Sequence, residues 1–339
     1  MNGGIVYPKE GAILACSLKE ESLGKAERYN HRIAMIEAGR LSHDPQINAA
    51  ATRLERNNIA VERAKLSEHV YDSKKIPPPN APDGWKQLSD EEVKDKKILG
   101  LPPGEMYNKD TGFKASVYVS EFEGKKKYVV AFAGTEGFFD RDMVANIRQG
   151  AAFETAQYTQ AMKIGNQVSR ALGPENVEFT GHSLGGGLAS AAKIVSDTNK
   201  VETKASTFNS AGLSLKTCAR QGISPKEFLE RTENINAYYS KSDPLSIGQD
   251  SVLSLGINKA IGARHPVSIT PEHQHSWNEL LIPALLSAFE PLLGFSSAIL
   301  RLAKMGGDGH SIKVMVNNIE HEKTEDANIL CKTNVQRIL

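Results

Sequence analysis

Residues 177–192 read VEFTGHSLGGGLASAA, an apolar run that breaks at a glycine and continues with helix-forming residues. The first residues favour a buried strand, and the leucine and alanines after the glycines favour a helix packed closely against a sheet. Between them, residues 181–185 fit G-x-S-x-G, the sharp turn from strand to helix that lifts a serine hydroxyl above an α/β sheet. The glycines let backbone and helix approach closely, while Ser183 is held in a strained conformation.

Two other glycine-rich motifs also open a helix, and neither fits this stretch. A P-loop needs Gly-Lys-Ser/Thr at the start of its helix, and no lysine stands there. A dinucleotide-binding loop needs G-x-G-x-x-G, but counting from Gly185 the sixth position is Ser190. A helix packed tightly on a strand explains the glycines but not Ser183. The rest of the chain must show whether this turn carries a catalytic serine or only packs a helix against a strand.

Composition and charge narrow the classes of function. The 339 residues include 41 Lys and Arg against 40 Asp and Glu, a formal net charge of +1, so no global field favours nucleic acid or an anionic surface. The three cysteines are odd in number and lack the spacing of a metal site, and we expect neither metal nor cofactor. Residues 1–21 have no basic segment followed by an apolar one, so no cleaved signal peptide is expected.

The chain divides into a helical N-terminal part and a longer part in which strands and helices alternate. Residues 19–75 carry apolar residues at helical spacing, which predicts two or three amphipathic helices. The proline-rich residues 76–85 cannot be helical. We therefore predict a helical segment or cap over residues 1–78 and a catalytic domain over residues 79–339.

The longer part opens with an expected hairpin and continues with strands separated by helices. Strands are expected near residues 116–122, 128–133, 177–182, 206–209 and 235–239, and helices near 155–172 and 188–199. This order predicts an α/β fold with a mostly parallel central sheet and helices on both faces.

A serine on such a turn needs an acid and a base that follow it in the chain. The best acid is Asp243, because it comes just after an expected strand that Pro244 ends. Its carboxylate would emerge at the carboxyl edge of the sheet, where ligands bind in such folds. Asp197 lies in the helix after the turn, and Asp250 is further from any strand end. A turn-forming role is the structural alternative for Asp243.

The favoured base is His310, which follows the glycine-rich stretch 306–309 and precedes residues of helical character. The other downstream histidines are His265, His273, His275 and His321. Three of these could suggest a metal site, but no H-x-x-x-H pattern or cluster of acids supports one, so a surface loop is favoured. His182 adjoins the nucleophile, but neighbours on a tight turn point in different directions.

The oxyanion of an acyl-transfer reaction needs backbone donors near the serine. One donor should be the N–H of Leu184, the residue after the nucleophile. The other should come from the turn Gly134–Gly137, which follows the buried strand of the hairpin. There, Thr135 could offer both its N–H and its hydroxyl. The alternative is that this stretch is a simple turn.

Taken together, these motifs resemble the class 3 (fungal-type) lipases. The matching motifs are AFAGT at 131–135, D-x-x-x-N at 142–146, GHSLGG at 181–186, SDP at 242–244 and GHSI at 309–312. Their order and spacing match over about residues 115–245, with the histidine motif as a later anchor. The resemblance implies an α/β-hydrolase fold that acts on acyl esters of lipids. It also implies Ser183, Asp243 and His310 as triad, with Thr135 and Leu184 as oxyanion hole.

The match has departures and limits. Many class 3 lipases carry arginine before Gly-Thr, where this chain has Ala133. The lid that the family places after the glycine turn would correspond to residues 138–142, which look short. The apolar stretch 280–302 contains Glu290 and two prolines, which argues against a membrane-spanning helix. It can be a pair of buried helices or a mobile interfacial lid.

These observations predict a serine esterase of the lipase type, with membrane phospholipids as the expected substrate. An acyltransferase or thioesterase with the same triad is one alternative, and a silent hydrolase-like binding module is another. The layout as a whole is similar to bacterial lipases exported without signal peptides, notably antibacterial type VI secretion effectors. That resemblance implies a cytoplasmic location in the producer, export to a target cell, transient contact with a membrane surface and an immunity-type inhibitor protein.

Overall fold

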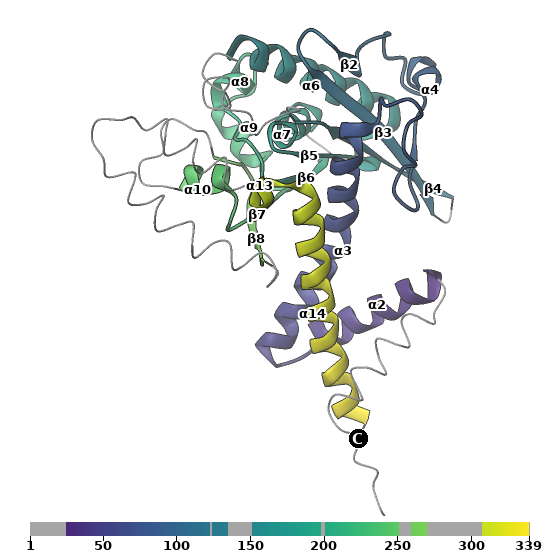
Figure 1. Ribbon diagram of the computed structural model, residues 1–339, viewed down its shortest axis with the longest axis vertical. Coiled ribbons are helices and arrows are strands. Elements are labelled where there is room, and N and C mark those ends of the chain that lie inside the picture. Colours follow the sequence, from purple (N-terminus) through teal and green to yellow (C-terminus); the bar gives the residue numbers. More distant parts are fainter. Residues whose placement is uncertain are drawn as a thin grey trace, which may run out of the picture. The chain divides into compact units, whose positions relative to one another are not determined.

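The computed structural model describes residues 25–122, 124–134, 151–197, 201–250, 259–269 and 307–338 (Figure 1). The chain divides into two compact units, one of residues 1–61 with 317–339 and the other of residues 62–316. This division differs from the predicted boundary after residue 78. The last turns of an N-terminal helix pack against the sheet, whereas the end of the chain packs with the N-terminal helices.

The larger unit contains an eight-stranded sheet in the order β1-β3-β4-β5-β6-β7-β8, with β2 paired to β3. The strands are β1 (Lys86–Gln87), β2 (Tyr107–Asn108), β3 (Phe113–Phe122), β4 (Lys125–Phe132), β5 (Val177–His182), β6 (Lys204–Phe208), β7 (Ile235–Ser240) and β8 (Ala263–Val267). Strand β3 pairs antiparallel with β1, β2 and β4, and the strands from β4 to β8 are parallel. The predicted α/β architecture with a mostly parallel sheet is confirmed.

Helices join the parallel strands, as the pairing geometry of such strands requires. In chain order this unit contains the last turns of α3 (Pro45–Asp72), then α4 (Asp90–Lys94), α6 (Ala151–Leu172), the 3₁₀ helix η1 (Pro174–Asn176), α7 (Leu184–Ser196), α8 (Leu215–Ala219), α9 (Pro225–Glu230), α10 (Pro244–Asp250), α13 (Gly307–His310) and the start of α14 (Ile312–Ile338). Helix α7 joins β5 to β6, so it begins at the carboxyl edge of the sheet.

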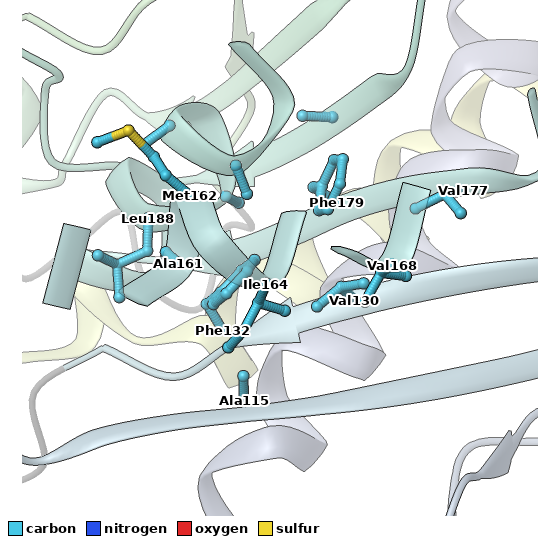
Figure 2. Close-up of a cluster of buried hydrophobic side chains, with 14 of the residues drawn as sticks. Ala115, Val130, Phe132, Ala161, Met162, Ile164, Val168, Val177, Phe179 and Leu188 are labelled. Carbon is cyan, nitrogen blue, oxygen red and sulfur yellow. The ribbon is translucent and has the colours of Figure 1, made fainter. Parts of the chain in front are cut away.

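Strand β4 shows how both faces of the sheet are covered. Val130 and Phe132 belong to a core that also contains side chains of α6 and α7 (Figure 2). The intervening residues, Val129 and Ala131, belong to a second cluster with Leu66 of α3. Because successive side chains of a strand point to opposite faces, β4 is buried on both sides. This burial explains the apolar run at residues 129–132 in the second half of the strand, after the exposed lysines at 125–127.

The described part of the smaller unit is helical. It contains α2 (Lys25–Arg40), the first turns of α3 and the main part of α14. Its apolar core includes Met35, Ile36, Ala50, Leu54 and Leu330. Polar contacts join α3 to α14: Arg53 Nη2 lies 2.5 Å from Asp326 Oδ1, and Asn57 Nδ2 donates to Glu322 Oε2 at 3.0 Å. The contribution of the C-terminal helix to this unit was not predicted.

Several predicted features lie outside the described residues. They are Thr135, the short lid at 138–142 and the apolar stretch at 280–302. The two alternatives for residues 280–302, buried helices or a lid, stay predictions. In the part of the chain that the structure describes, no helix is long and apolar enough to cross a membrane.

Candidate active site

Ser183 occupies the turn between β5 and α7 with a strained backbone. Its φ and ψ are 58° and −128°, and φ is positive at only one other non-glycine residue of the described ranges. The Ser183 N–H donates to the carbonyl of Phe208 at 3.0 Å, and its carbonyl accepts from Gly186 N at 3.0 Å and Ala211 N at 2.9 Å. Such a conformation costs about 1–3 kcal/mol and persists only where surrounding contacts hold it.

The glycines beside Ser183 are required by close packing. A Cβ atom at Gly181 would lie 2.2 Å from the carbonyl oxygen of Gly185. One at Gly185 would lie 2.1 Å from the carbonyl oxygen of Phe132. Because both neighbours are backbone atoms, they cannot move aside as a side chain can. Any larger residue would push α7 away from β4 and β5, and the serine with it.

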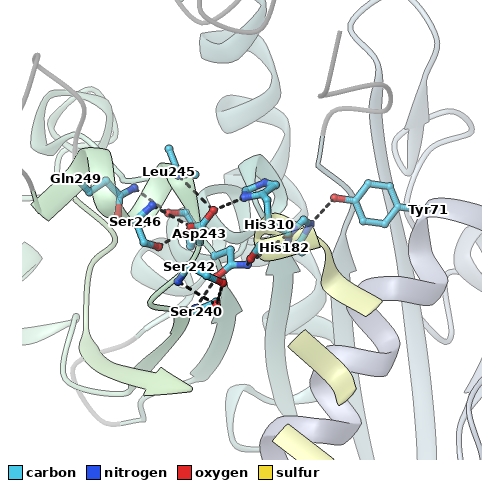
Figure 3. A network of polar contacts seen from close by, with 12 residues as sticks. Tyr71, His182, Ser240, Ser242, Asp243, Leu245, Ser246, Gln249 and His310 are labelled. Atoms are coloured by element: carbon cyan, nitrogen blue, oxygen red, sulfur yellow. Dashed lines mark hydrogen bonds and ion pairs between the residues drawn. The ribbon is translucent and has the colours of Figure 1, made fainter. Parts of the chain in front are cut away.

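Asp243 and His310 meet at the carboxyl edge of the sheet, just beyond β7. His310 Nδ1 lies 2.6 Å from Asp243 Oδ1, and both side chains are buried (Figure 3). Asp243 also accepts hydrogen bonds from Leu245 N at 3.2 Å, Ser246 N at 2.9 Å and Ser246 Oγ at 2.6 Å. Asp243 therefore has two roles. Its carboxylate accepts the hydrogen bonds that cap the start of the following helix, and it also binds His310. With Nδ1 facing the carboxylate, Nε2 is the nitrogen left to exchange a proton with a reacting group.

Ser183 also lies at the carboxyl edge of the sheet, where β5 ends, and its hydroxyl has no hydrogen-bond partner among the described residues. The side chain is buried, and Ser183 Oγ makes no hydrogen bond within the described chain. The bond between serine and histidine that a closed triad would have is thus not formed here. Catalytic hydrogen bonds are often long or poorly aligned without substrate and tighten when substrate binds.

His182 is a residue whose contacts sequence reasoning did not find. Its Nε2 lies 2.6 Å from the backbone carbonyl oxygen of His310, and its Nδ1 lies 3.0 Å from the hydroxyl of Tyr71 on α3 (Figure 3). Burial, and then the charge of His310, lowers the pKa of His182 well below 6.5. Through these contacts His182 reaches the turn that carries the proposed base.

Asn209 is a second residue that sequence reasoning missed. It follows β6 with a φ of 41° and is fully buried. Its side-chain Nδ2 donates to the carbonyl oxygens of Gly309 at 3.1 Å and His310 at 3.3 Å, and its Oδ1 accepts from Ser240 N at 2.9 Å. One signal could have identified it, because an asparagine directly after a parallel strand lies at the edge where ligands bind.

The oxyanion side of the site is described only in part. Leu184 is the first residue of α7, so its N–H belongs to the unpaired first turn of that helix. Thr135 lies outside the described residues, which end on this side at Gly134. The Gly134 N–H donates to the hydroxyl of Tyr71 at 3.1 Å. A Cβ atom at Gly134 would lie 3.3 Å from Ser183 Cβ, so this turn does adjoin the serine.

Two of the other histidines downstream of Ser183 have polar partners within the described residues. His265 Nε2 bonds to Asn236 Oδ1 at 2.8 Å, and His321 on α14 lies 3.4 Å from Glu325. His273 and His275 lie outside the described residues. Within the described ranges, no group of three or more His, Cys, Asp and Glu side chains could hold a metal ion.

A family model described as the Tle-like phospholipase domain matches residues 62–273, which is more than half of the chain. The chain belongs to this family. The match begins where the larger unit begins, at residue 62, and covers the strands that surround Ser183. The motifs predicted a lipase-like family, and this match confirms that prediction.

The chain is similar to one curated relative in sequence and, more distantly, to two solved structures. The extracellular phospholipase A1 of Serratia liquefaciens is 35% identical over 170 residues, which are 50% of this chain and 49% of the relative. The chain thus spans about half the length of that relative. A mutant form of MDLA from Penicillium cyclopium has a TM-score of 0.39 at 16% identity, covering 64% of this chain and 80% of that chain. Lip2 lipase from Yarrowia lipolytica has a TM-score of 0.36 at 15% identity, covering 63% and 79%.

Proposed function

We propose that this chain is a serine esterase of the lipase type that hydrolyses acyl esters of phospholipids. The observation that carries the proposal is the strained, buried Ser183 at the carboxyl edge of the sheet that also holds the Asp243–His310 pair. Membership of the Tle-like phospholipase family supports phospholipid as the substrate. The name of the Serratia relative supports the sn-1 acyl ester as the bond that is cleaved.

The proposed reaction is acyl transfer to the serine followed by hydrolysis. Ser183 Oγ attacks the ester carbonyl carbon while His310 Nε2 takes the hydroxyl proton, and Asp243 holds the imidazole in the required tautomer. The negative oxygen of the tetrahedral intermediate accepts hydrogen bonds from the N–H of Leu184 and from Thr135. The bond to the leaving alcohol then breaks, and His310 returns the proton to the alcohol oxygen. Water deacylates the serine by the same steps and releases the fatty acid.

The proposal is tested with purified protein and vesicles of a phosphatidylcholine that carries different acyl chains at its two positions. The expected products are the fatty acid of the sn-1 position and the matching lysophospholipid, identified by mass spectrometry. Ser183→Ala should reduce turnover by about 10³-fold or more. The matched control is Ser190→Ala on the same helix, whose buried Oγ donates to the Gly186 carbonyl at 2.9 Å, and it should keep turnover near the wild-type value.

Two outcomes would overturn this function. Near-normal turnover by Ser183→Ala would remove the serine from the chemistry. Appearance of the acyl group on an added alcohol or thiol acceptor, in place of free fatty acid, would make the chain an acyltransferase.

We also propose that the enzyme is exported from its producer, acts on the membrane of a target bacterium and has an immunity-type inhibitor protein. The similarity of the chain's layout to secreted lipase effectors supports this role. Expression in the periplasm of a naive bacterium should stop growth, whereas the Ser183→Ala protein should not. Equal growth with both proteins would count against the role of toxin and remove the need for an inhibitor.

A further inference from the structure

The backbone carbonyl of His310 is held by two side chains, one at the end of β5 and one directly after β6. His182 Nε2 lies 2.6 Å from this oxygen and Asn209 Nδ2 lies 3.3 Å from it. A carbonyl oxygen has two lone pairs, so it can accept both bonds. Both contacts are to the main chain of His310, whereas its imidazole Nδ1 contacts Asp243. The proposed base is thus fixed twice, once through its ring and once through its backbone.

The hydrogen bonds around His182 define its tautomer. Because the Gly134 N–H donates to the oxygen of Tyr71, the Tyr71 hydroxyl hydrogen can be donated to His182 Nδ1. A neutral imidazole that accepts at Nδ1 carries its proton at Nε2, where it can donate to the His310 carbonyl. The lowered pKa of buried His182 agrees with a neutral ring. Tyr71 therefore selects the tautomer in which His182 can hold the base.

Asn209 joins the acid side of the site to the base side. The same side-chain amide accepts from Ser240 N at 2.9 Å and donates to the carbonyls of Gly309 and His310. Ser240 ends β7, shortly before Asp243. Asparagine tolerates the left-handed backbone found here better than most residues. Asn209 thus connects the main chain that precedes the acid with the main chain that carries the base.

The turn that carries His310 depends on such contacts. Helix α13 has only four residues, so it cannot position a side chain by its own stability. A Cβ atom at Gly309 would lie 2.5 Å from the carbonyl oxygen of Ser242, so the turn is pressed against the loop that leads to Asp243. A short turn in this position needs bonds from neighbouring strands if its histidine is to have one fixed place.

We propose that His182 and Asn209 are positioning residues that fix the main chain of His310, and that Tyr71 acts through His182. The inference rests on the proposed function, in which His310 is the general base. Misplacing a catalytic group by about 1 Å can cost about 10²-fold in rate. Losing one of the two donors should therefore lower kcat by about 10- to 100-fold, with little change in KM, because these residues hold the base and not the substrate.

The main experiment compares His182→Gln with His182→Leu on a soluble nitrophenyl ester. A glutamine amide can reach the place of His182 Nε2 and donate to the same carbonyl, whereas leucine keeps bulk and removes the donor. The Gln variant should retain kcat within about threefold of the wild type, and the Leu variant should lose about 10- to 100-fold at nearly constant KM. Rates are expressed per active serine, counted by a burst titration with a fluorophosphonate, so that unfolded protein does not contribute.

Asn209→Gly extends the test, because glycine accepts the positive φ and removes only the amide. It should lower kcat like His182→Leu. The matched control is Ser67→Ala, which removes a buried hydrogen bond of 2.9 Å to Thr180 on β5 without touching His310. A merely structural role predicts that all of these variants lose thermal stability and keep kcat per active serine. That result would overturn the proposal.

A second readout does not require activity. The hydrogen bond between His310 Nδ1 and Asp243 should give a low-field, exchange-protected proton resonance in the NMR spectrum of the wild type. His182→Gln should retain this resonance, and His182→Leu and Asn209→Gly should broaden or lose it. If those two variants keep the resonance and kcat, the positioning role is wrong even where Ser183→Ala is inactive. If wild type and Ser183→Ala turn over esters equally, the proposed function fails, and the resonance alone decides whether the backbone contacts order the turn.

Discussion

The larger unit contains two buried acid–base pairs of equal length and different placement. Asp243 and His310 are 2.6 Å apart, with side-chain exposures of 0% and 4%. Lys193 and Asp197 are also 2.6 Å apart, with exposures of 0% and 2%. The second pair comes from one helix, four residues apart, whereas the first joins segments that are 67 residues apart in the chain.

The surroundings of the two pairs decide what each can do. Lys193 also donates to the carbonyl of Arg231, and Asp197 Oδ1 accepts from both Thr203 N and Thr203 Oγ1 at 2.8 Å. This pair is enclosed by fixed partners at the end of α7. The Asp243–His310 pair lies at the carboxyl edge of the sheet and contains a ring whose second nitrogen can exchange a proton. Burial and a short contact therefore do not identify a site, whereas position in the sheet and the type of side chain do.

The largest effect that this comparison predicts is on the activity of Asp243→Asn. The amide can still accept from Ser246 N, but its NH₂ group would face His310 Nδ1 and favour the wrong imidazole tautomer. We expect kcat for a soluble ester to fall by about 10⁴-fold. The midpoint of thermal unfolding should change by only a few degrees. A large loss of stability with normal kcat in the remaining folded protein would make this pair structural, like Lys193–Asp197.

Lys193→Met should show the opposite behaviour. Removing the ammonium group leaves the carboxylate of Asp197 buried without its cation, so the free energy of unfolding should fall by about 3–5 kcal/mol. Urea denaturation measures this loss, and kcat per active serine should stay near the wild-type value. The double variant Lys193→Met with Asp197→Asn should recover part of the stability. If kcat falls while stability is unchanged, the pair belongs to the reaction.

Two tyrosine–histidine contacts allow a finer version of the same comparison. Tyr71 bonds to His182 beside the site, and Tyr118 bonds to His69 Nδ1 at 2.8 Å on another part of the sheet. Tyr71→Phe and Tyr118→Phe should each lower the free energy of unfolding by about 0.5–1.5 kcal/mol. Only Tyr71→Phe should reduce kcat, by about tenfold, because the tautomer of His182 is no longer selected. Equal kcat in both variants would limit Tyr71 to a structural role.

The sheet and the turn at Ser183 could be predicted because their signals are local. The run from Val177 to Ala192 contains the strand, the glycines and the helix within one stretch. Asp243 could be chosen because it follows a strand, and Asp197 could be set aside because of the helix before it. Chain order and strand ends were sufficient for these choices.

The contacts of α3 could not be predicted in the same way. The prolines after residue 76 show where that helix must stop, but they do not show what its last turns pack against. In the structure, Arg63 Nε donates to Glu178 Oε2 at 2.8 Å, and Ser67 Oγ contacts Thr180 Oγ1 at 2.9 Å. Both partners are on β5, more than a hundred residues away in the chain. Tyr71 lies in the same turns, so its place beside His182 follows from packing that carries no local sequence signal.

The last prediction concerns His182 and the pH dependence of stability. The ring is buried like that of His310, with ring centroids 4.7 Å apart, but Tyr71 and the backbone of His310 take the place of a carboxylate partner. Its pKa is lowered well below 6.5 in the native state, so below about pH 6.5 the unfolded chain binds a proton that the native protein does not. Stability should therefore fall as the pH decreases from 6.5 towards the native pKa, by at most about 1.4 kcal/mol per pH unit.

His182→Gln cannot bind this proton, so the difference in unfolding free energy between wild type and variant isolates the effect from other titrating groups. That difference should be constant above about pH 7.5 and should shift against the wild type at lower pH. A difference that stays constant down to pH 5, or that shifts in favour of the wild type, would show that native His182 binds the proton at least as readily as the unfolded chain does.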